Sequence, residues 1–94
     1  MASIRNIKKD VDYLVGEVIS DCYTYLFIHD EKNKEKVFEI IEGVVDKRND
    51  LIQRINNPEK GIDKKQKKEY FKTIFNDLLK MVDDSFSKLS QLAN

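Results

Sequence analysis

The chain of 94 residues has few turn-forming and cross-linking residues: three glycines, one proline, one cysteine and no tryptophan. So few turn formers exclude collagen-like, linker-like and many-stranded β architectures. The single cysteine, Cys22, excludes an internal disulfide and a paired-cysteine zinc site. Basic and acidic residues number 17 each, so no net charge attracts the chain to nucleic acid or to an anionic membrane.

Long apolar runs are also missing. The longest uninterrupted run covers residues 25–28, whereas a membrane-spanning helix needs about 20 apolar residues. Residues 1–5 do not resemble an export segment. We therefore expect a cytoplasmic protein without membrane association, folded as a single domain over residues 1–94.

What the sequence does contain is helical periodicity. Apolar residues recur at steps of three and four and predict helices at about residues 4–28, 34–55 and 64–92. No segment shows the strict alternation of a half-buried strand, and the strongest turn sequence is residues 57–61, which include Pro58. Two short connections predict an all-α, antiparallel three-helix bundle with long helices and coiled-coil-like packing.

Local sequence also predicts how the helices begin. Ser3 is the expected N-cap of the first helix, and Asn33 or Asp30 that of the second. Asp63, followed three residues later by Gln66, predicts a capping box at the third. Gly16 and Gly43 lie inside predicted helices, where a missing side chain predicts close approach of two backbones.

The residue types that usually carry chemistry are badly spaced for it. Cys22 and His29 are seven residues apart, about 10.5 Å along a helix, too far to share a metal ion or to act as nucleophile and base. We interpret Cys22 as a small buried residue and His29 as an imidazole at a helix C-terminus. The expectation is a protein without catalytic residues, metal or cofactor, and hence not an enzyme.

One charged residue interrupts the apolar stripe of the second predicted helix. Arg48 stands where an apolar residue is expected, so its guanidinium must find a partner or extend to solvent. Its candidate partners on the other helices are Glu17, Asp21 and Asp77. We favour a buried ion pair that fixes helix register. The alternatives are a polar pocket or anion site, or a small enzyme or metal-binding bundle centred on Glu17, Asp21 and Arg48.

A cluster of lysines follows the proline-containing turn. Six lie between residues 60 and 72: Lys60, Lys64, Lys65, Lys67, Lys68 and Lys72. Four of them are candidate phosphate contacts, namely Lys64, Lys65, Lys67 and Lys68, which makes a nucleic-acid-associated regulator the first alternative function. The cluster lacks arginine, the residue that makes bidentate base contacts, and we favour a solvated helix face.

The end of the first predicted helix is apolar all round. Residues 22–28 sweep nearly two helical turns, and two neighbouring helices cannot cover them on every side. Either they form the closed end of the core, or they contact another molecule. The candidate interface comprises Tyr23, Tyr25, Leu26, Phe27 and Ile28. The preferred function is a non-catalytic protein-interaction or structural module that forms a homodimer or binds a protein partner.

Three segments carry a resemblance: residues 9–13, residues 16–22, and residues 48–54 with the Asn57-Pro58-Glu59 sequence that follows. Together they resemble a family of small all-helical proteins of Bacteroidetes-type bacteria to which no activity, cofactor or catalytic residue is assigned. The resemblance covers most of the chain. It implies a short, stand-alone, bacterial cytoplasmic protein with a helical fold, and it leaves the function open.

Overall fold

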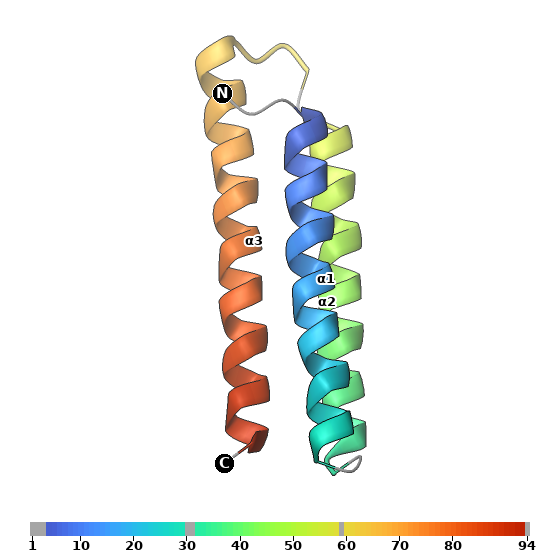
Figure 1. The fold of residues 1–94 in the computed structure, drawn as a ribbon. Coiled ribbons are helices and arrows are strands. Elements are labelled where there is room, and N and C mark those ends of the chain that lie inside the picture. Colours follow the sequence, from blue (N-terminus) through green and yellow to red (C-terminus); the bar gives the residue numbers. More distant parts are fainter. Residues whose placement is uncertain (1–3, 30–31, 59, 94) are drawn as a thin grey trace.

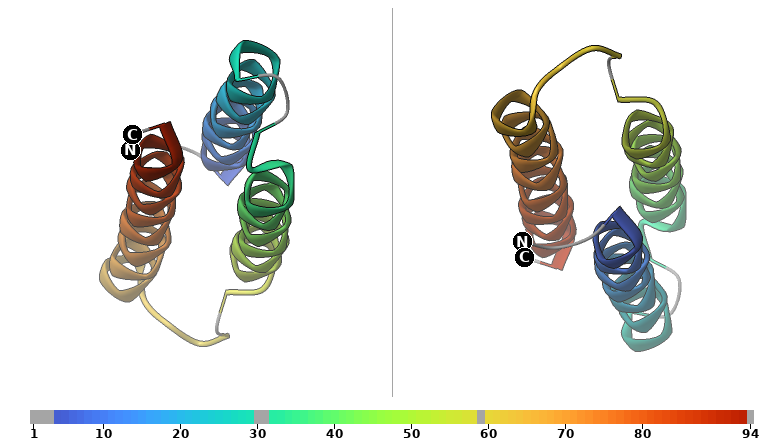
Figure 2. Two further views of the ribbon diagram at one scale, coloured as in Figure 1. Left: turned by 90° about the horizontal axis from the view of Figure 1, so that it is seen from below. Right: turned by 90° about the horizontal axis from the view of Figure 1, so that it is seen from above.

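The chain folds into three antiparallel helices, as described by a computed structural model over residues 4–29, 32–58 and 60–93. They are α1 (Ile4–Ile28), α2 (Lys34–Asn56) and α3 (Lys64–Ala93). Figures 1 and 2 show them side by side along one direction, with α1 and α2 adjacent and α3 beside both. No strand occurs in the described ranges. The all-α three-helix bundle is confirmed, and each predicted helix end lies within one residue of the observed one.

The bundle is a rod of 51 × 18 × 17 Å with a thin core along its axis. The apolar stripes meet there, because residues three and four apart share one face of a helix. Fully buried side chains are Val11, Val18 and Cys22 of α1, Val37, Val44, Leu51 and Ile55 of α2, and Ile74 and Leu78 of α3. Each helix thus buries one stripe and leaves its opposite face to solvent.

The capping box predicted for α3 is confirmed. The Asp63 amide donates to Gln66 Oε1 at 3.1 Å, and the Gln66 amide donates to Asp63 Oδ1 at 2.8 Å. Asn33 does occupy the N-cap position of α2, with a left-handed φ of 60°, but its side chain makes no cap hydrogen bond. Its Nδ2 donates instead to the Tyr25 hydroxyl at 3.0 Å. The other expected caps, Ser3 and Asp30, lie outside the described residues.

Two tyrosines tie α3 to its neighbours near opposite ends of the rod. The Tyr25 hydroxyl donates to the Leu92 carbonyl at 3.0 Å, which joins α1 to the end of α3. The Tyr70 hydroxyl donates to the Arg54 carbonyl at 2.7 Å, which joins α3 to the end of α2. Each ring packs against the core while its hydroxyl satisfies a carbonyl oxygen. These contacts show which flanks of α1 and α2 face α3.

The prediction of close backbone approach at the two helical glycines is wrong. Both Gly16 and Gly43 are exposed, and no neighbouring atom lies within 4 Å of the position that a Cβ would occupy. Periodicity marks these positions as helical but does not say which neighbour faces them. Both glycines therefore leave shallow hollows on the surface of the rod.

Candidate functional site

The structure divides the predicted interface of residues 23–28 into buried and exposed members. Tyr25 and Leu26 lie in the core with 6% and 8% of their surface exposed, so their assignment to an exposed interface is corrected. Tyr23, Phe27 and Ile28 are 56%, 88% and 68% exposed. The end of α1 is therefore only partly covered by the chain itself, as its all-round apolar character predicts.

The ion pair between Asp12 and Arg48 identifies the flanks on which α1 and α2 meet at the surface. Arg48 Nη2 lies 3.0 Å from Asp12 Oδ1, and Nε donates to the same oxygen at 3.0 Å. From Asp12, steps of three and four residues lead along α1 toward the α1–α2 connection. From Arg48, the same steps lead backward along α2 to that connection, because the two helices are antiparallel.

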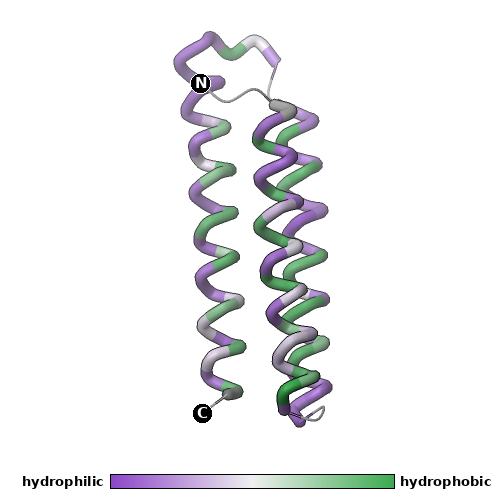
Figure 3. The backbone as a smooth tube through the Cα atoms, in the orientation of Figure 1, coloured by the Kyte–Doolittle hydropathy of each residue, from purple (hydrophilic) through white to green (hydrophobic). Residues whose placement is uncertain are grey.

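Both rows are uncharged between the ion pair and Lys34, the residue at which α2 begins. We call them together the outer apolar surface: Gly16, Ile19, Tyr23 and Phe27 of α1 with Phe38, Ile41 and Val45 of α2. Phe38 and Val45 are 40% and 38% exposed. The surface holds four of the seven large apolar side chains that are exposed within the described ranges. Figure 3 shows apolar segments recurring along this half of the α1–α2 pair.

Helix α3 does not cover this surface, because it packs on the other flanks of α1 and α2. On α1 it contacts Tyr25, through the hydrogen bond to Leu92. On α2 it contacts Arg54, whose Nη1 lies 2.9 Å from Asp77 Oδ2. Ile28 follows Tyr25 by three residues and therefore lies on the flank toward α3, away from Tyr23 and the outer apolar surface.

The candidate interface predicted from the sequence contains no residue of α2. Phe38, Ile41 and Val45 widen the apolar stripe of α2 beyond what one neighbouring helix can bury, and this width was the available indication. Lys34 extends the same row, with its Nζ 5.9 Å from the centre of the Phe38 ring. An aromatic and aliphatic surface across two helices thus replaces the single-helix interface that was predicted.

The predicted partners of Arg48 are wrong, and so is the prediction that its ion pair is buried. Arg48 does form an ion pair, but the side chains of Arg48 and Asp12 are 38% and 58% exposed. Its acidic partner is Asp12 rather than Glu17, Asp21 or Asp77. Glu17 and Asp21 are exposed on α1, and Asp77 pairs with Arg54. Counting back equally from the α1–α2 connection brings Arg48 opposite Leu14, half a turn from Asp12. The four residues of the predicted polar pocket therefore do not converge.

The lysine cluster forms a solvated face at the start of α3. Its six lysines are exposed, as expected. Among the described residues no acidic side chain lies within ion-pair distance of them. Asp63 is engaged in the capping box, and Glu59 lies outside the described residues. This end of α3 therefore presents positive charge to solvent, added to the positive end of the helix dipole.

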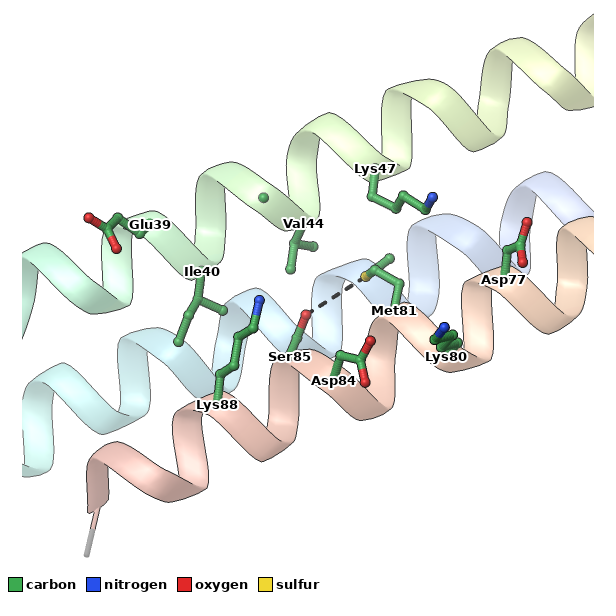
Figure 4. A pocket seen from close by; sticks show the side chains of 11 residues that line it. Glu39, Ile40, Val44, Lys47, Asp77, Lys80, Met81, Asp84, Ser85 and Lys88 are labelled. Carbon is green, nitrogen blue, oxygen red and sulfur yellow. Dashed lines mark hydrogen bonds between the residues drawn. The ribbon is translucent and has the colours of Figure 1, made fainter.

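A groove of about 410 Å³ runs between α2 and α3 on another side of the rod (Figure 4). Val44, Met81 and Ser85 form its floor, where the Ser85 hydroxyl lies 3.9 Å from the Met81 sulfur. Its rim alternates three lysines with three acids: Lys47, Lys80 and Lys88 with Glu39, Asp77 and Asp84. Because the charges are mixed, the groove selects no ligand of one sign.

The residues with potential for covalent or metal chemistry lie apart from one another. Burial raises the pKa of the Cys22 thiol, and the Asp21 carboxylate raises it further, so Cys22 stays a neutral thiol near pH 7. The His29 ring stacks on Tyr25 with centroids 4.3 Å apart. No group of three or more histidine, cysteine or acidic side chains within the described ranges is arranged to hold a metal ion. None of the helices, over those residues, has the length and apolarity needed to cross a membrane.

Comparison with known proteins adds no relative: no protein-family model, curated protein or solved structure matches this chain. The resemblance to helical proteins of Bacteroidetes-type bacteria therefore stays a prediction. Three features of the surface are candidates for function: the outer apolar surface, the lysine cluster and the groove. Of these three, the outer apolar surface is least like a solvated helix face, because its exposed side chains are apolar.

Proposed function

We propose that the protein is a non-catalytic helical interaction module that self-associates through the outer apolar surface. The observation that carries this proposal is the exposure of Tyr23 and Phe27 on α1 and of Phe38 and Val45 on α2. Helical spacing from the Asp12–Arg48 ion pair places the two pairs on the flanks where α1 and α2 meet. Contiguous apolar patches of this kind mark interaction sites. Aromatic side chains supply much of the binding energy where such sites are buried.

The energetic argument follows from the apolar area that is left in water. Burying apolar surface contributes about 25 cal/mol per Å², and Phe27 alone leaves 88% of its surface accessible. Between the Asp12–Arg48 ion pair and Lys34 at the start of α2, the two rows carry no charged group whose desolvation would oppose contact. A partner covering both rows gains apolar burial at little electrostatic cost.

The proposal is tested by the solution mass, measured by light scattering after size exclusion. We expect a mass near twice the chain mass of 11.1 kDa. Phe27→Lys should shift it to the monomer, since a lysine there opposes apolar contact while suiting the negative end of α1. The matched control is Leu79→Lys, because Leu79 is also exposed, at 42%, but lies on α3.

A chain that stays monomeric up to ~100 μM contradicts the proposal, since even an association free energy of about −5.5 kcal/mol gives half occupancy there. A dimer that Leu79→Lys disrupts as strongly as Phe27→Lys contradicts the choice of surface. Either variant should retain its helical circular dichroism and its cooperative thermal transition. Substitutions at exposed positions usually change stability by less than about 0.5 kcal/mol.

A second candidate function is nucleic-acid binding through the lysine cluster, favoured by the unpaired positive face of α3. Phosphate contacts made by Lys64, Lys65, Lys67 and Lys68 would give binding that weakens as salt increases. A mobility shift at about 50 mM salt that is lost on charge reversal at these four positions would support it. No shift at that salt concentration would refute it.

A further inference from the structure

The outward face of α1 carries a narrow uncharged stripe, which we call the α1 stripe: Tyr13, Gly16, Ser20, Tyr23 and Phe27. These residues recur at steps of three and four, the spacing of a helix–helix seam. All five are exposed, and they lie opposite the side of α1 that buries Val11, Val18 and Cys22. Charged residues make up 36% of the chain, yet none interrupts this face of α1 between Tyr13 and Phe27.

We propose that a second copy of this chain packs its α1 antiparallel against α1 along this stripe, with the two-fold axis at Ser20. This inference rests on the proposed function and specifies its partner and geometry. Counting equally from Ser20 places Tyr13 opposite Phe27, and Gly16 opposite Thr24, one residue from Tyr23. A two-fold contact requires one surface to complement itself in this way.

The sizes of the side chains favour the antiparallel arrangement. Gly16 leaves a hollow, because no atom lies within 4 Å of its missing Cβ. The partner's Tyr23 ring fills that hollow as a knob fills a hole. The Ser20 residues at the axis are small enough to let the helices approach. A parallel arrangement would instead place Gly16 beside Gly16 and leave both hollows empty.

The charges along α1 favour the same arrangement. Lys9 lies on the α1 stripe one turn before Tyr13 and is exposed. In the antiparallel dimer it extends past Phe27 to the C-terminal end of the partner's α1, which is the negative end of the helix dipole. The last turn of α1 carries no basic side chain of its own. A parallel dimer would place Lys9 beside the partner's Lys9.

The acids of α1 lie at the rim of this contact. Glu17 and Asp21 are exposed on the flank toward α3, and the two-fold axis brings the acids of both copies to the same edge. Their mutual repulsion is screened by salt. Added salt should therefore strengthen the dimer, whereas it would weaken binding of nucleic acid to the lysine cluster.

The decisive experiment places a cysteine on the two-fold axis. In a Cys22→Ala background, Ser20→Cys should form a disulfide-linked dimer on mild oxidation, because residues at the axis come within the Cα separation of about 7 Å that a disulfide tolerates. Ser87→Cys in the same background is the control, since Ser87 is exposed on α3. We expect most of the Ser20→Cys chains to cross-link, and the control not to.

A second measurement separates the geometry from the proposed function. A spin label on Asp10→Cys, also in the Cys22→Ala background, lies ten residues from the axis, so an antiparallel dimer separates the two labels by about 30 Å along the helices. A parallel dimer holds them at about the helix spacing of 10 Å. A dimer with the short distance, or without Ser20→Cys cross-linking, overturns the antiparallel geometry and leaves self-association standing. A monomer at ~100 μM overturns both.

Discussion

Two exposed faces near opposite ends of the rod differ in what they offer to solvent (Figure 1). The outer apolar surface lies toward the α1–α2 connection and joins Tyr23 and Phe27 to Phe38 without an intervening charge. The lysine cluster presents six lysines, five at the start of α3 and Lys60 just before it. Both faces belong to helices with well-buried opposite stripes, so helix formation alone explains neither. We therefore place the proposed association surface at the α1–α2 end of the rod rather than at the lysine cluster.

The largest expected effect comes from placing lysines on the outer apolar surface, so that it resembles the lysine cluster. Tyr23→Lys combined with Phe27→Lys should weaken self-association by more than a hundredfold, about 3 kcal/mol, because two aromatic contacts are replaced by like charges. Sedimentation equilibrium measures this change. The control is Lys64→Gln combined with Lys68→Gln, which has the same spacing on α3 and should leave the dimer intact. Equal effects of the two double variants would remove the distinction between the faces.

A pair of glycine variants sharpens the comparison. Gly16 and Gly43 are both exposed, helical and without atoms near a new Cβ. Glutamine at either position should stabilise the monomer by about 0.5 kcal/mol through helix propensity. Only Gly16→Gln fills the hollow that receives the partner's Tyr23, so it alone should weaken the dimer, by about tenfold. Titration calorimetry of dilution measures the association. If Gly43→Gln weakens self-association as much as Gly16→Gln does, the hollow at Gly16 does not receive the partner's Tyr23.

Much of the fold follows from the sequence because helices obey local rules. The periodicity of α1, α2 and α3 and the Asp63–Gln66 capping box depend on residues within one or two turns. The division of residues 23–28 into buried and exposed members does not follow from local sequence. It depends on which side of α1 each neighbouring helix occupies. Tyr25 faces α3 whereas Tyr23 is exposed, and periodicity is the same for either handedness of the bundle.

The partner of Arg48 shows a second limit. Its place in the apolar stripe predicts an ion pair, but choosing Asp12 over Glu17 requires the register of two antiparallel helices. Counting back from the α1–α2 connection supplies that register to within half a turn. Predicting the outer apolar surface requires both the register of the helices and the handedness of the bundle. The sequence alone therefore does not group Phe38 and Val45 with Tyr23.

The capping box offers a way to perturb the lysine face alone. Asp63→Ala removes the 2.8 Å bond to the Gln66 amide and should lower the free energy of unfolding by about 1 kcal/mol. Asp63→Asn should restore most of it, since asparagine also caps helices well. Urea denaturation in the Phe27→Lys background separates folding from association. In the chain that retains Phe27, Asp63→Ala should leave the dissociation constant of the dimer unchanged. A loss of dimer on Asp63→Ala would place part of the contact at the start of α3.

The smallest expected effect tests where the outer apolar surface ends. Arg48→Leu removes an exposed ion pair worth less than about 1 kcal/mol and continues the apolar row of α2 beyond Val45. Folding stability should change little, while self-association should tighten about threefold, or ~0.6 kcal/mol, through added apolar burial. Arg54→Leu is the matched control, because Arg54 pairs with Asp77 on the flank toward α3. Tightening by Arg54→Leu rather than Arg48→Leu would move the association surface to the α2–α3 side, where mixed charges line the groove.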